Sequence, residues 1–544
     1  MLTTFANRKE TKRMKITPID YNKVDGLSER DLEFINQDGR LDDTITAWAS
    51  LEAFEEVIST RSKHNIDRVL LVSMLNKQYA GTETTESAKQ NIESLSSEKT
   101  FTVVTAHQPS LFTGPLYYMY KIASVINLTQ QLCKTYPSFN FVPVFVSGGE
   151  DHDFDEINKV NIYQKQVVWE NEEEGPVGRM SLNGVEKALA ELLDIIGDRS
   201  PHADRLSEIL KKAVANAKTY GDINFYIINE LFGKFGLVYL NMDQAEFKQK
   251  FIPIIKDELL NQSSNGIVNA SIDIIESRGL KIQARPRNIN LFYFQKGIRE
   301  RIVKEGDKYT VLNTDLSFSV DEMLKLVEES PELFSPNVLL RPLYQETILP
   351  NLAYIGGGGE IAYWTERKKQ FEHYSLPFPL LIRRNSALQV SGGIQKQLGK
   401  TPFGLTSFLS TKLELTNLFL KEYVTEDFTL SESKAAIAKI FEEISTKVKD
   451  IDQSLVSVVK AESTKQIKVI GNIEAKLKKA IKSQNDVQLG RISSIKEKLY
   501  PSNNLQERVE NFAQYYANYG DDWIAFLVDN LNPLDSIYSL IELS

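Results

Sequence analysis

The N-terminal part of the chain alternates between helical and strand-like patterns of hydrophobic residues. Residues 20–78 show helical spacing, and a β-rich run follows at 101–105. The loop 106–113 then leads into an apolar helix that opens at Pro115, and a second buried strand is expected at 141–146. A strand, a helix and a second strand at this spacing are typical of a βαβ unit, so the sequence predicts a parallel sheet.

Further strands are predicted downstream of this unit. A run at 237–240 has strand character, and the runs at 352–355 and 380–383 could return to the main sheet. Segments 288–294 and 309–312 look antiparallel and indicate a small added sheet. The predicted fold class is therefore α/β, with a parallel-sheet core that carries insertions.

The composition shifts at 431–500 to Lys, Glu, Ser, Ile and Val without proline. Apolar residues recur there every three or four positions with charged outer faces, which is the pattern of a coiled coil, and 450–454 is a plausible turn of an antiparallel hairpin. Ordinary amphipathic helices lying on the main domain are the alternative, less favoured because the apolar stripes are narrow. The aromatic residues after Pro501 predict a tail that folds back onto the main body.

These patterns divide the 544 residues into three parts. Residues 1–410 form the α/β core, with insertions at about 177–235 and 262–330. Residues 411–505 form a helical coiled-coil arm, and residues 506–544 are expected to be C-terminal helices that pack back on the core.

Charge and cysteine content narrow the function classes. The net charge of -9 argues against general binding to nucleic acid or anionic membranes. Cys133 is the single cysteine, which excludes internal disulfides and a cysteine zinc cluster and fits a reducing cytoplasm. No apolar run is long enough to cross a membrane, and residues 1–14 lack the apolar core of a secretory signal. We expect a cytoplasmic protein whose initiator could be Met1 or Met14.

The first candidate site follows the first strand, at 105–115. Ligands bind at the carboxyl ends of strands in open α/β sheets, and a helix N-terminus offers N–H groups to an anion. His107 is placed to bind a phosphate or carboxylate, or to move a proton. A turn histidine at the surface is the alternative.

The second candidate site is the segment 150–156, directly after the second strand. Five carboxylates and His152 occupy these seven residues. They could hold an ammonium group, coordinate Mg²⁺ through oxygens or supply a general base, whereas no second histidine or cysteine stands at zinc-ligand spacing. The crowded like charges should raise some carboxyl pKa values unless a cation is present. An acidic helix start is the alternative, but it explains only one or two of the carboxylates.

The third candidate site combines 341–347 with the glycine-rich run 356–364. Glycines let a backbone approach a phosphate closely, so the run could bind an anion, or it could simply allow a tight turn. It is not the dinucleotide fingerprint, because Ile361 replaces the last glycine. A P-loop-like Gly399-Lys400-Thr401 is better interpreted as a helix end.

The order and spacing of these motifs resemble the bacillithiol biosynthesis cysteine-adding enzyme family from about Met14 to the C-terminus. The resemblance rests on the runs 112–117, 120–122, 149–158, 341–347, 359–364 and 505–508. It implies a Rossmann-like core, similar to those of class I aminoacyl-tRNA synthetases and nucleotidylyltransferases, with connecting-peptide insertions and a coiled coil. The chain departs from the family where His107-Gln108-Pro109 replaces a common Gln-Gln pair with glycine.

The resemblance also implies the last step of bacillithiol synthesis, in which a ligase joins cysteine to glucosaminyl-malate through an amide. The carboxylate must be activated, so we expect ATP or a related nucleotide, with Mg²⁺ as a further possibility, and a homodimer formed through the coiled coil. We expect Lys121 to lie too deep to reach a ligand. The catalytic candidates are His152, Asp151, Asp153, Glu150 and His107. The candidates for binding substrate or nucleotide are Gln108, Thr113, Gly114, Asp155, Asn158, Arg341, Gln345, Glu346, Gly358, Gly359, Glu360, Tyr363, Trp364 and Arg383.

Two other functions remain open from the sequence. A nucleotidylyltransferase or synthetase-like enzyme acting on another small acid would share the fold and the phosphate site. A non-catalytic coiled-coil interaction protein is the second alternative. The density of polar residues in the three candidate sites argues against it.

Overall fold

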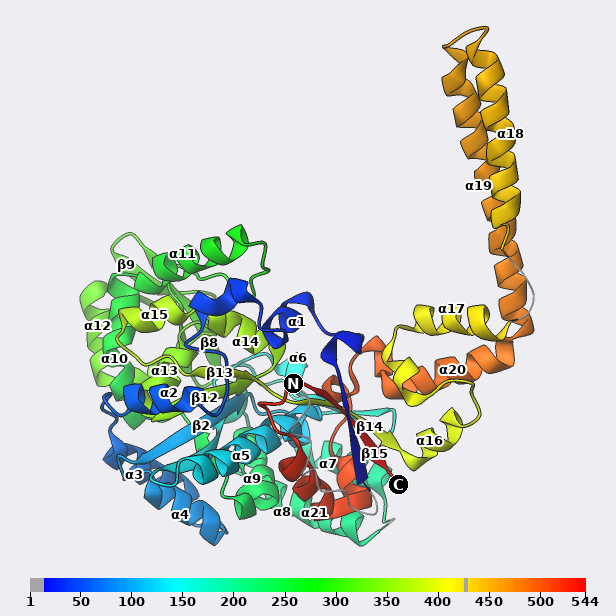
Figure 1. Ribbon diagram of the computed structural model, residues 1–544. Helices are drawn as coiled ribbons and strands as arrows, with labels where there is room; N and C mark the ends of the chain where they lie inside the picture. The colour runs from blue at the N-terminus through cyan, green and yellow to red at the C-terminus, as the bar shows by residue number, and fades with distance from the viewer. Residues whose placement is uncertain (1–13, 199, 425–428) are drawn as a thin grey trace. The chain divides into compact units, whose positions relative to one another are not determined.

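The computed structural model describes residues 14–198, 200–424 and 429–544. The chain forms two compact units (Figure 1). One contains the residues up to Gln389 together with Asn504–Ser544, and the other is Val390–Asn503. Within the described residues, no helix has the length and apolar character that a membrane span requires.

A five-stranded sheet of order β13-β12-β2-β3-β6 forms the centre of the first unit. All of its neighbouring strands are parallel, so their carboxyl ends meet at one edge, where His107 lies opposite Ser147 and Gly356 opposite Arg383. The predicted parallel sheet is confirmed, and the predicted strands at 352–355 and 380–383 belong to it. The strands are β2 (Thr100–His107), β3 (Asn140–Ser147), β6 (Val238–Asn241), β12 (Asn351–Gly356) and β13 (Leu380–Arg383).

Helices cover the central sheet. The predicted crossover helix is α5 (Tyr117–Thr135), which packs on β2, β3 and β12 and is buried over most of its length (Figure 1). Apolar side chains of β2, β12 and α5 pack together in the core. Both strands are buried on their two faces, as is usual for a parallel sheet. Other helices of the first unit are α1 (Glu29–Ile35), α2 (Ala53–Arg61), α3 (Arg68–Tyr79), α4 (Glu86–Ser94), α9 (Tyr220–Phe232), α10 (Ala245–Leu260), α13 (Arg341–Ile348), α14 (Gly358–Thr365) and α15 (Lys368–His373).

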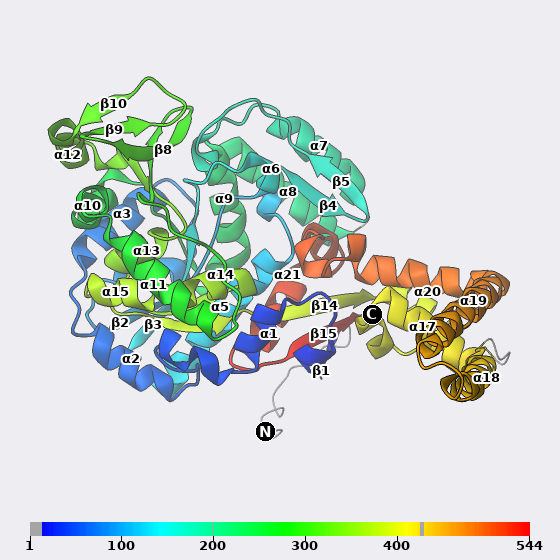
Figure 2. The same ribbon diagram turned by 90° about the horizontal axis from the view of Figure 1, so that it is seen from above.

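Two insertions extend the core as separate lobes (Figure 2). The first contains α6 (Phe154–Ile157), the hairpin of β4 (Lys159–Ile162) and β5 (Lys165–Val168), α7 (Val185–Ile196) and α8 (Pro201–Asn216). The second is the predicted antiparallel sheet, now seen with five strands in the order β10-β9-β8-β7-β11. Its elements are β7 (Leu291–Gln295), β8 (Ile298–Glu305), β9 (Lys308–Val311), β10 (Ser317–Ser319), α12 (Val320–Glu329) and β11 (Phe334–Pro336). The helix α11 (Ser263–Ser277), which precedes it in the chain, packs against α15 and α10.

The C-terminal tail closes a third, three-stranded sheet. The helix α21 (Ala513–Asn530) packs against α5 and α8, as the aromatic tail predicted. The expectation of helices alone was wrong, because β15 (Tyr538–Leu543) pairs antiparallel with β1 (Met14–Ile19) and also borders β14 (Ser386–Ser391). Its side chains are almost all buried, which stabilises a strand at this position.

The second unit contains the predicted helical hairpin. Helices α18 (Ser431–Lys449) and α19 (Leu455–Gln484) pack along each other, and the chain turns between them where the sequence predicted. No residue of α18 is buried. Gly399 ends a helix, so the helix-end interpretation of the P-loop-like triplet is confirmed. The other helices are α16 (Gly392–Leu398), α17 (Lys412–Tyr423) and α20 (Asp486–Leu499).

We expect Ile541→Ala to lower the free energy of unfolding by about 2–5 kcal/mol, because it leaves a cavity in a buried strand. Ile541 has no exposed surface, whereas its neighbour Glu542 is partly exposed. Urea unfolding of both variants is the measurement, with Glu542→Ala as the matched control. Equal losses in the two variants would show that the tail strand does not contribute to the core.

Candidate functional site

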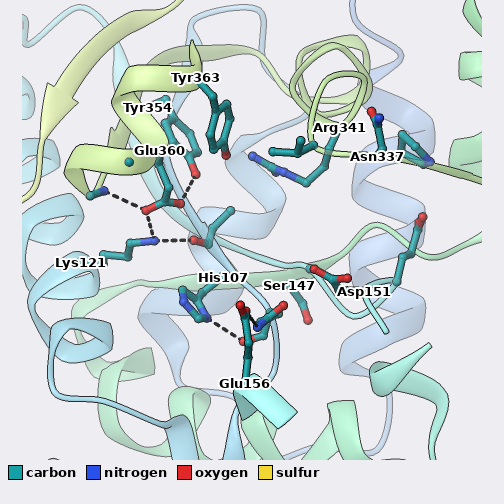
Figure 3. Close-up of a pocket in the computed structure, with 18 of the residues that line it drawn as sticks. His107, Lys121, Ser147, Asp151, Glu156, Asn337, Arg341, Tyr354, Glu360 and Tyr363 are labelled. Carbon is teal, nitrogen blue, oxygen red and sulfur yellow. Dashed lines mark hydrogen bonds and ion pairs between the residues drawn. The ribbon is translucent and has the colours of Figure 1, made fainter. Parts of the chain in front are cut away.

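A cavity of about 670 Å³ lies at the carboxyl edge of the central sheet (Figure 3). Its wall comes from the ends of β2 and β3, which contribute His107 and Ser147, and from α5, which contributes Lys121. The helices α13 and α14 complete it with Arg341 and Glu360. This is the edge at which open α/β sheets bind ligands, and we call this space the central cavity.

The central cavity collects about half of the residues predicted from the sequence. The predicted residues that line it are His107, Gln108, Glu150, Asp151, Arg341, Gly358, Gly359, Glu360 and Tyr363. The predicted residues outside its lining are Thr113, Gly114, His152, Asp153, Asp155, Asn158, Gln345, Glu346, Trp364 and Arg383. All three candidate sites therefore contribute to one cavity, but not with every residue proposed.

Lys121 reaches the cavity wall, contrary to the expectation from its position deep on α5. Its Nζ lies 2.5 Å from Glu360 Oε2 and donates to the carbonyl of Ala106 at 2.8 Å. Tyr354 donates to the other carboxylate oxygen of Glu360 at 2.8 Å. Burial disfavours the charged carboxylate, but the ammonium of Lys121 outweighs it and lowers the pKa of Glu360 to about 2. Glu360 is therefore a fixed anion that binds Lys121.

His107 is neutral at physiological pH. Burial and the nearby ammonium of Lys121 lower its pKa to about 4. The carbonyl of Gln108 lies 2.9 Å from Nδ1, so Nδ1 carries the hydrogen and Nε2 accepts from the Tyr117 hydroxyl at 2.8 Å. Both ring nitrogens are occupied by the chain itself, so the predicted binding of a phosphate by a charged His107 does not fit this environment.

The acidic loop after β3 is neutralised by cations of the chain. Glu150 Oε1 lies 2.7 Å from Nζ of Lys248, a fully buried side chain of α10. Asp151 lies 3.5 Å from the Arg299 guanidinium, which comes from β8. Although burial acts in the opposite direction, contacts with His152 and Arg299 lower the pKa of Asp151. The expectation of a raised carboxyl pKa is corrected for Asp151, because distant segments supply the cations.

The remaining residues of that loop point to different partners. His152 is half-exposed, and its Nδ1 accepts from Arg299 Nη1 at 2.6 Å. Because guanidinium only donates, Nδ1 of His152 is the acceptor in this contact. Glu156 lines the cavity and accepts from the Gln108 amide at 3.1 Å.

The glycine run does not form an open cradle for a phosphate. The N–H of Gly357 donates to Glu360 Oε2 at 2.8 Å, which caps the start of α14 from within the chain. Gly358 lies against the carboxylate of Asp31, so close that a Cβ at this position would lie 2.3 Å from it. Two carboxylates therefore already lie at this helix start, and a phosphate would meet their negative charge.

Arg383 does not reach the central cavity. Asp31 accepts from its Nε at 2.7 Å and from Nη2 at 2.9 Å, and both side chains are buried. The adjacent Arg384 lines the cavity instead, with Glu507 at 2.7 Å from its Nη2. The pattern of alternating side chains in an extended segment explains why only one of the two faces the cavity.

Three other predicted residues are buried in the protein interior and do not line the cavity. Trp364 is fully buried and stacks on Tyr354. Thr113 is also fully buried, and the carbonyl of Gly114 accepts from Asn511 of the C-terminal tail at 2.6 Å. Gly114 has a φ of +62°, and a Cβ there would lie 2.6 Å from Ser110, so this position requires glycine for conformational reasons.

Arg341, which is partly exposed, differs from the buried cations at the cavity. Its Nη1 donates to Gln345 Oε1 at 3.1 Å, and its guanidinium lies 5.8 Å from the centre of the Tyr354 ring. Its Nη2 has no hydrogen-bond partner of ordinary geometry, although the Tyr363 hydroxyl lies close enough to interact with the guanidinium. Among the described residues, Arg341 makes no ion pair with an aspartate or glutamate, whereas Lys121, Arg299 and Arg384 each do. Arg341 therefore offers a charged donor to an anion in the cavity.

Two cations at this site carried no signal in the sequence. Arg299 lines the cavity from β8, and Lys248 of α10 pairs with Glu150 from outside the lining. From the sequence, Arg384 could face a phosphate or be a surface charge, and it lines the cavity. Arg508 also lines the cavity, and its run 505–508 was part of the family resemblance. Within the described part of the chain, no three His, Cys, Asp or Glu side chains form a group able to hold a metal ion.

Comparison with known proteins covers nearly the whole chain. Residues 14–385 match the family model "Bacillithiol biosynthesis BshC, N-terminal Rossmann-like domain", and residues 387–543 match "Bacillithiol biosynthesis BshC, C-terminal coiled-coil domain". A protein of Flavobacterium psychrophilum, "Putative cysteine ligase BshC", is 40% identical over 527 residues, which are 96% of this chain and 99% of the relative.

Two further relatives carry the same name. The protein of Flavobacterium johnsoniae is 39% identical over 530 residues, or 96% of this chain and 99% of the relative. The protein of Cytophaga hutchinsonii is 35% identical over 515 residues, or 94% of each chain.

We expect Lys121→Met to lower the free energy of unfolding by about 3–5 kcal/mol, because it leaves the buried carboxylate of Glu360 without its cation. Glu360→Gln should also destabilise the fold, and the double variant should lose at least about 1 kcal/mol less than the sum. Because the pKa of Glu360 is lowered to about 2, the wild-type contribution is present above the ordinary value of 4.5 and is lost as pH falls toward 2.

Urea unfolding of the two single variants and the double variant at neutral pH measures this coupling. Additive losses would contradict the ion pair.

Proposed function

Because the chain belongs to the bacillithiol biosynthesis BshC family, as its resemblance predicted, we propose that it is a ligase that joins cysteine to the amino group of glucosaminyl-malate. The product of this reaction is an amide, and its thiol comes from cysteine. A cavity of about 670 Å³ has the size of a small-molecule site. Its position at the carboxyl edge of a parallel sheet supports a catalytic role.

The observation that carries the proposal is the unpartnered Nη2 of Arg341. A guanidinium N–H without an acceptor costs free energy, and because Arg341 lines the cavity, an anionic group of a ligand could supply the missing acceptor. The malate part of glucosaminyl-malate supplies carboxylates, and so does cysteine. Arg508 is exposed at the same cavity and is a second donor for such a group.

The opposite wall suits the amino group of the substrate. Asp151 and Glu156 line the cavity as carboxylates, and Arg299 and Gln108 hold them in place. A carboxylate close to the amine can orient it and accept its proton as the amide bond forms. Neutral His107 and the Arg299-bound His152 are poorer candidates for this base, because their Nε2 and Nδ1 atoms already accept hydrogen bonds.

ATP or a related nucleotide would supply the activation that amide formation in water requires. Its phosphates, with Mg²⁺, would find cationic donors in Arg341 and Arg508. The glycine run is a poor site for them, because Asp31 and Glu360 lie at that helix start.

We expect Arg341→Ala to lower ligation of cysteine to glucosaminyl-malate by about 10–100-fold, the range expected for a lost charged hydrogen bond. In cells that lack the gene, the wild-type protein should restore bacillithiol, and the variant should leave glucosaminyl-malate accumulated. The thiol profile of the cells and turnover of the purified variant are the measurements.

Arg285→Ala is the matched control, since Arg285 is an exposed arginine paired with Glu276 at 2.6 Å. An unchanged thiol profile in cells without the gene would refute the ligase function. A full rescue by Arg341→Ala would refute the role of this arginine.

We also propose that the hairpin of α18 and α19 forms a homodimer. Apolar side chains remain exposed along it, including Ile440 with 53% and Ile444 with 40% of its surface exposed. Such a row of exposed apolar residues on paired helices favours association with a second copy.

We expect Ile440→Glu with Ile444→Glu to convert the dimer to monomers, because two carboxylates would be buried in an apolar contact. Size-exclusion chromatography with light scattering measures the mass. Lys439→Glu changes the net charge by the same two units on a neighbouring exposed position and should leave the dimer intact. A dimer that persists in the double variant would place the interface elsewhere.

A further inference from the structure

Behind the wall of the central cavity, the buried side chain of Gln345 connects Arg341 to the carboxylate of Glu346. Gln345 lies one turn after Arg341 on α13, and its Oε1 accepts from Arg341 Nη1 at 3.1 Å. Its Nε2 donates to Glu346 Oε1 at 3.0 Å. Neither residue lines the cavity, and both are fully buried. Any effect they have on a ligand must therefore pass through Arg341.

The direction of the Gln345 amide depends on Glu346. An ionised carboxylate only accepts hydrogen bonds, so it selects the orientation in which the amide NH₂ faces Glu346. The carbonyl oxygen of Gln345 then faces Arg341. The reversed amide would place NH₂ against the guanidinium, donor against donor, and would release Arg341 from its present position.

Glu346 is itself fixed by two other elements. Asn351, at the start of β12, donates from Nδ2 to Glu346 Oε1 at 2.7 Å, and its own Oδ1 accepts from the Ala353 N–H at 3.3 Å. The register of β12 with β2 shifts between Asn351 and Ala353, which places this side chain at the irregularity. Arg61, at the end of α2, lies 3.7 Å from Glu346 Oε2. Oε1 is thus held by two amide donors, whereas Oε2 faces the Arg61 guanidinium and has no hydrogen-bond partner.

We propose that Glu346 is a positioning residue for the acidic substrate: acting through Gln345, it holds Arg341 so that Nη2 remains available to a carboxylate in the central cavity. This inference rests on the proposed function, because it assumes that Arg341 binds that carboxylate. Glu346 does not touch the substrate, and its contribution is the orientation of the arginine.

The charge of Glu346 can change near neutral pH. Burial raises its pKa to about 7, although Arg61, Asn351, Gln345 and Arg341 all act in the opposite direction. These are the charged and polar groups that face it from α2, β12 and its own helix. A protonated Glu346 can donate as well as accept, so it no longer dictates the amide orientation. Ligand binding through Arg341 should therefore weaken as pH falls through about 7.

The experiment is calorimetric binding of glucosaminyl-malate between about pH 6 and pH 8.5, on either side of the Glu346 pKa. The proteins are wild type, Glu346→Gln, Gln345→Met and Arg341→Ala. Because the amino group of the ligand titrates in the same range, the readout is the ratio of variant Kd to wild-type Kd at each pH. We expect Glu346→Gln to bind about fivefold or more weakly at pH 8.5, and this ratio to approach one at pH 6.

Gln345→Met and one added variant, Glu366→Gln, serve as controls. Gln345→Met leaves the Arg61–Glu346 contact intact and should show the same weakening, so it carries the test if Glu346→Gln does not fold. Glu366→Gln is the matched control, because Glu366 is a buried carboxylate 3.4 Å from the buried Arg367 and its pKa is also raised by burial, yet it does not line the cavity. It should bind like wild type at every pH.

The outcomes separate this inference from the proposed function. Wild-type affinity in Arg341→Ala would refute the role of this arginine in substrate binding and, with it, the basis of this inference, whereas the ligase function itself is tested by the thiol profile of cells without the gene. Weak binding by Arg341→Ala together with wild-type affinity in Gln345→Met, and in Glu346→Gln where it folds, would overturn the positioning role alone. A variant-to-wild-type ratio that is constant with pH, or that Glu366→Gln reproduces, would show that Glu346 has only a structural role.

Discussion

The arrangement of the cavity depends on the two contacts that the buried ammonium of Lys121 makes. It binds the carbonyl of Ala106 at the end of β2 and the carboxylate of Glu360 on α14, and so joins the first strand, the crossover helix and the glycine-started helix. Because a buried ammonium must be paired, this contact fixes where Glu360 and its neighbour Tyr354 lie. Glu360 in turn caps α14, which leaves the helix start unsuitable for a second anion.

The same principle organises the other charges of the cavity. Glu150 is bound by Lys248, Asp151 by Arg299 and Glu507 by Arg384, so most of the charge at this edge is neutralised within the chain. Arg341 lines the cavity without an ion pair to any carboxylate of the described residues, and its Nη2 lacks a hydrogen-bond partner. A site that pairs most of its charges within the chain and leaves Arg341 and Arg508 as charged donors favours an anionic ligand, because few groups must be desolvated on binding.

The fold could be predicted largely from the sequence, whereas the charge pairing could not. Buried strands and the helical hairpin have local hydrophobic patterns, so their positions and the parallel sheet followed from the chain alone. The partners of the acidic loop come from α10 and β8, about a hundred or more residues away, and no local pattern marks Lys248 or Arg299. Nor could the sequence distinguish Arg383, which binds Asp31, from Arg384, which lines the cavity. The strand at the C-terminus was missed because its partner is at the other end of the chain.

A structure of the protein in complex with glucosaminyl-malate tests the central claim most directly. The account predicts a malate carboxylate oxygen at about 3 Å from Arg341 Nη2, the ordinary length of such a hydrogen bond, with the amino group of the sugar toward Asp151 and Glu156. A ligand whose carboxylates bind at the start of α14, or outside the central cavity with Arg341 Nη2 still without a partner, would contradict it.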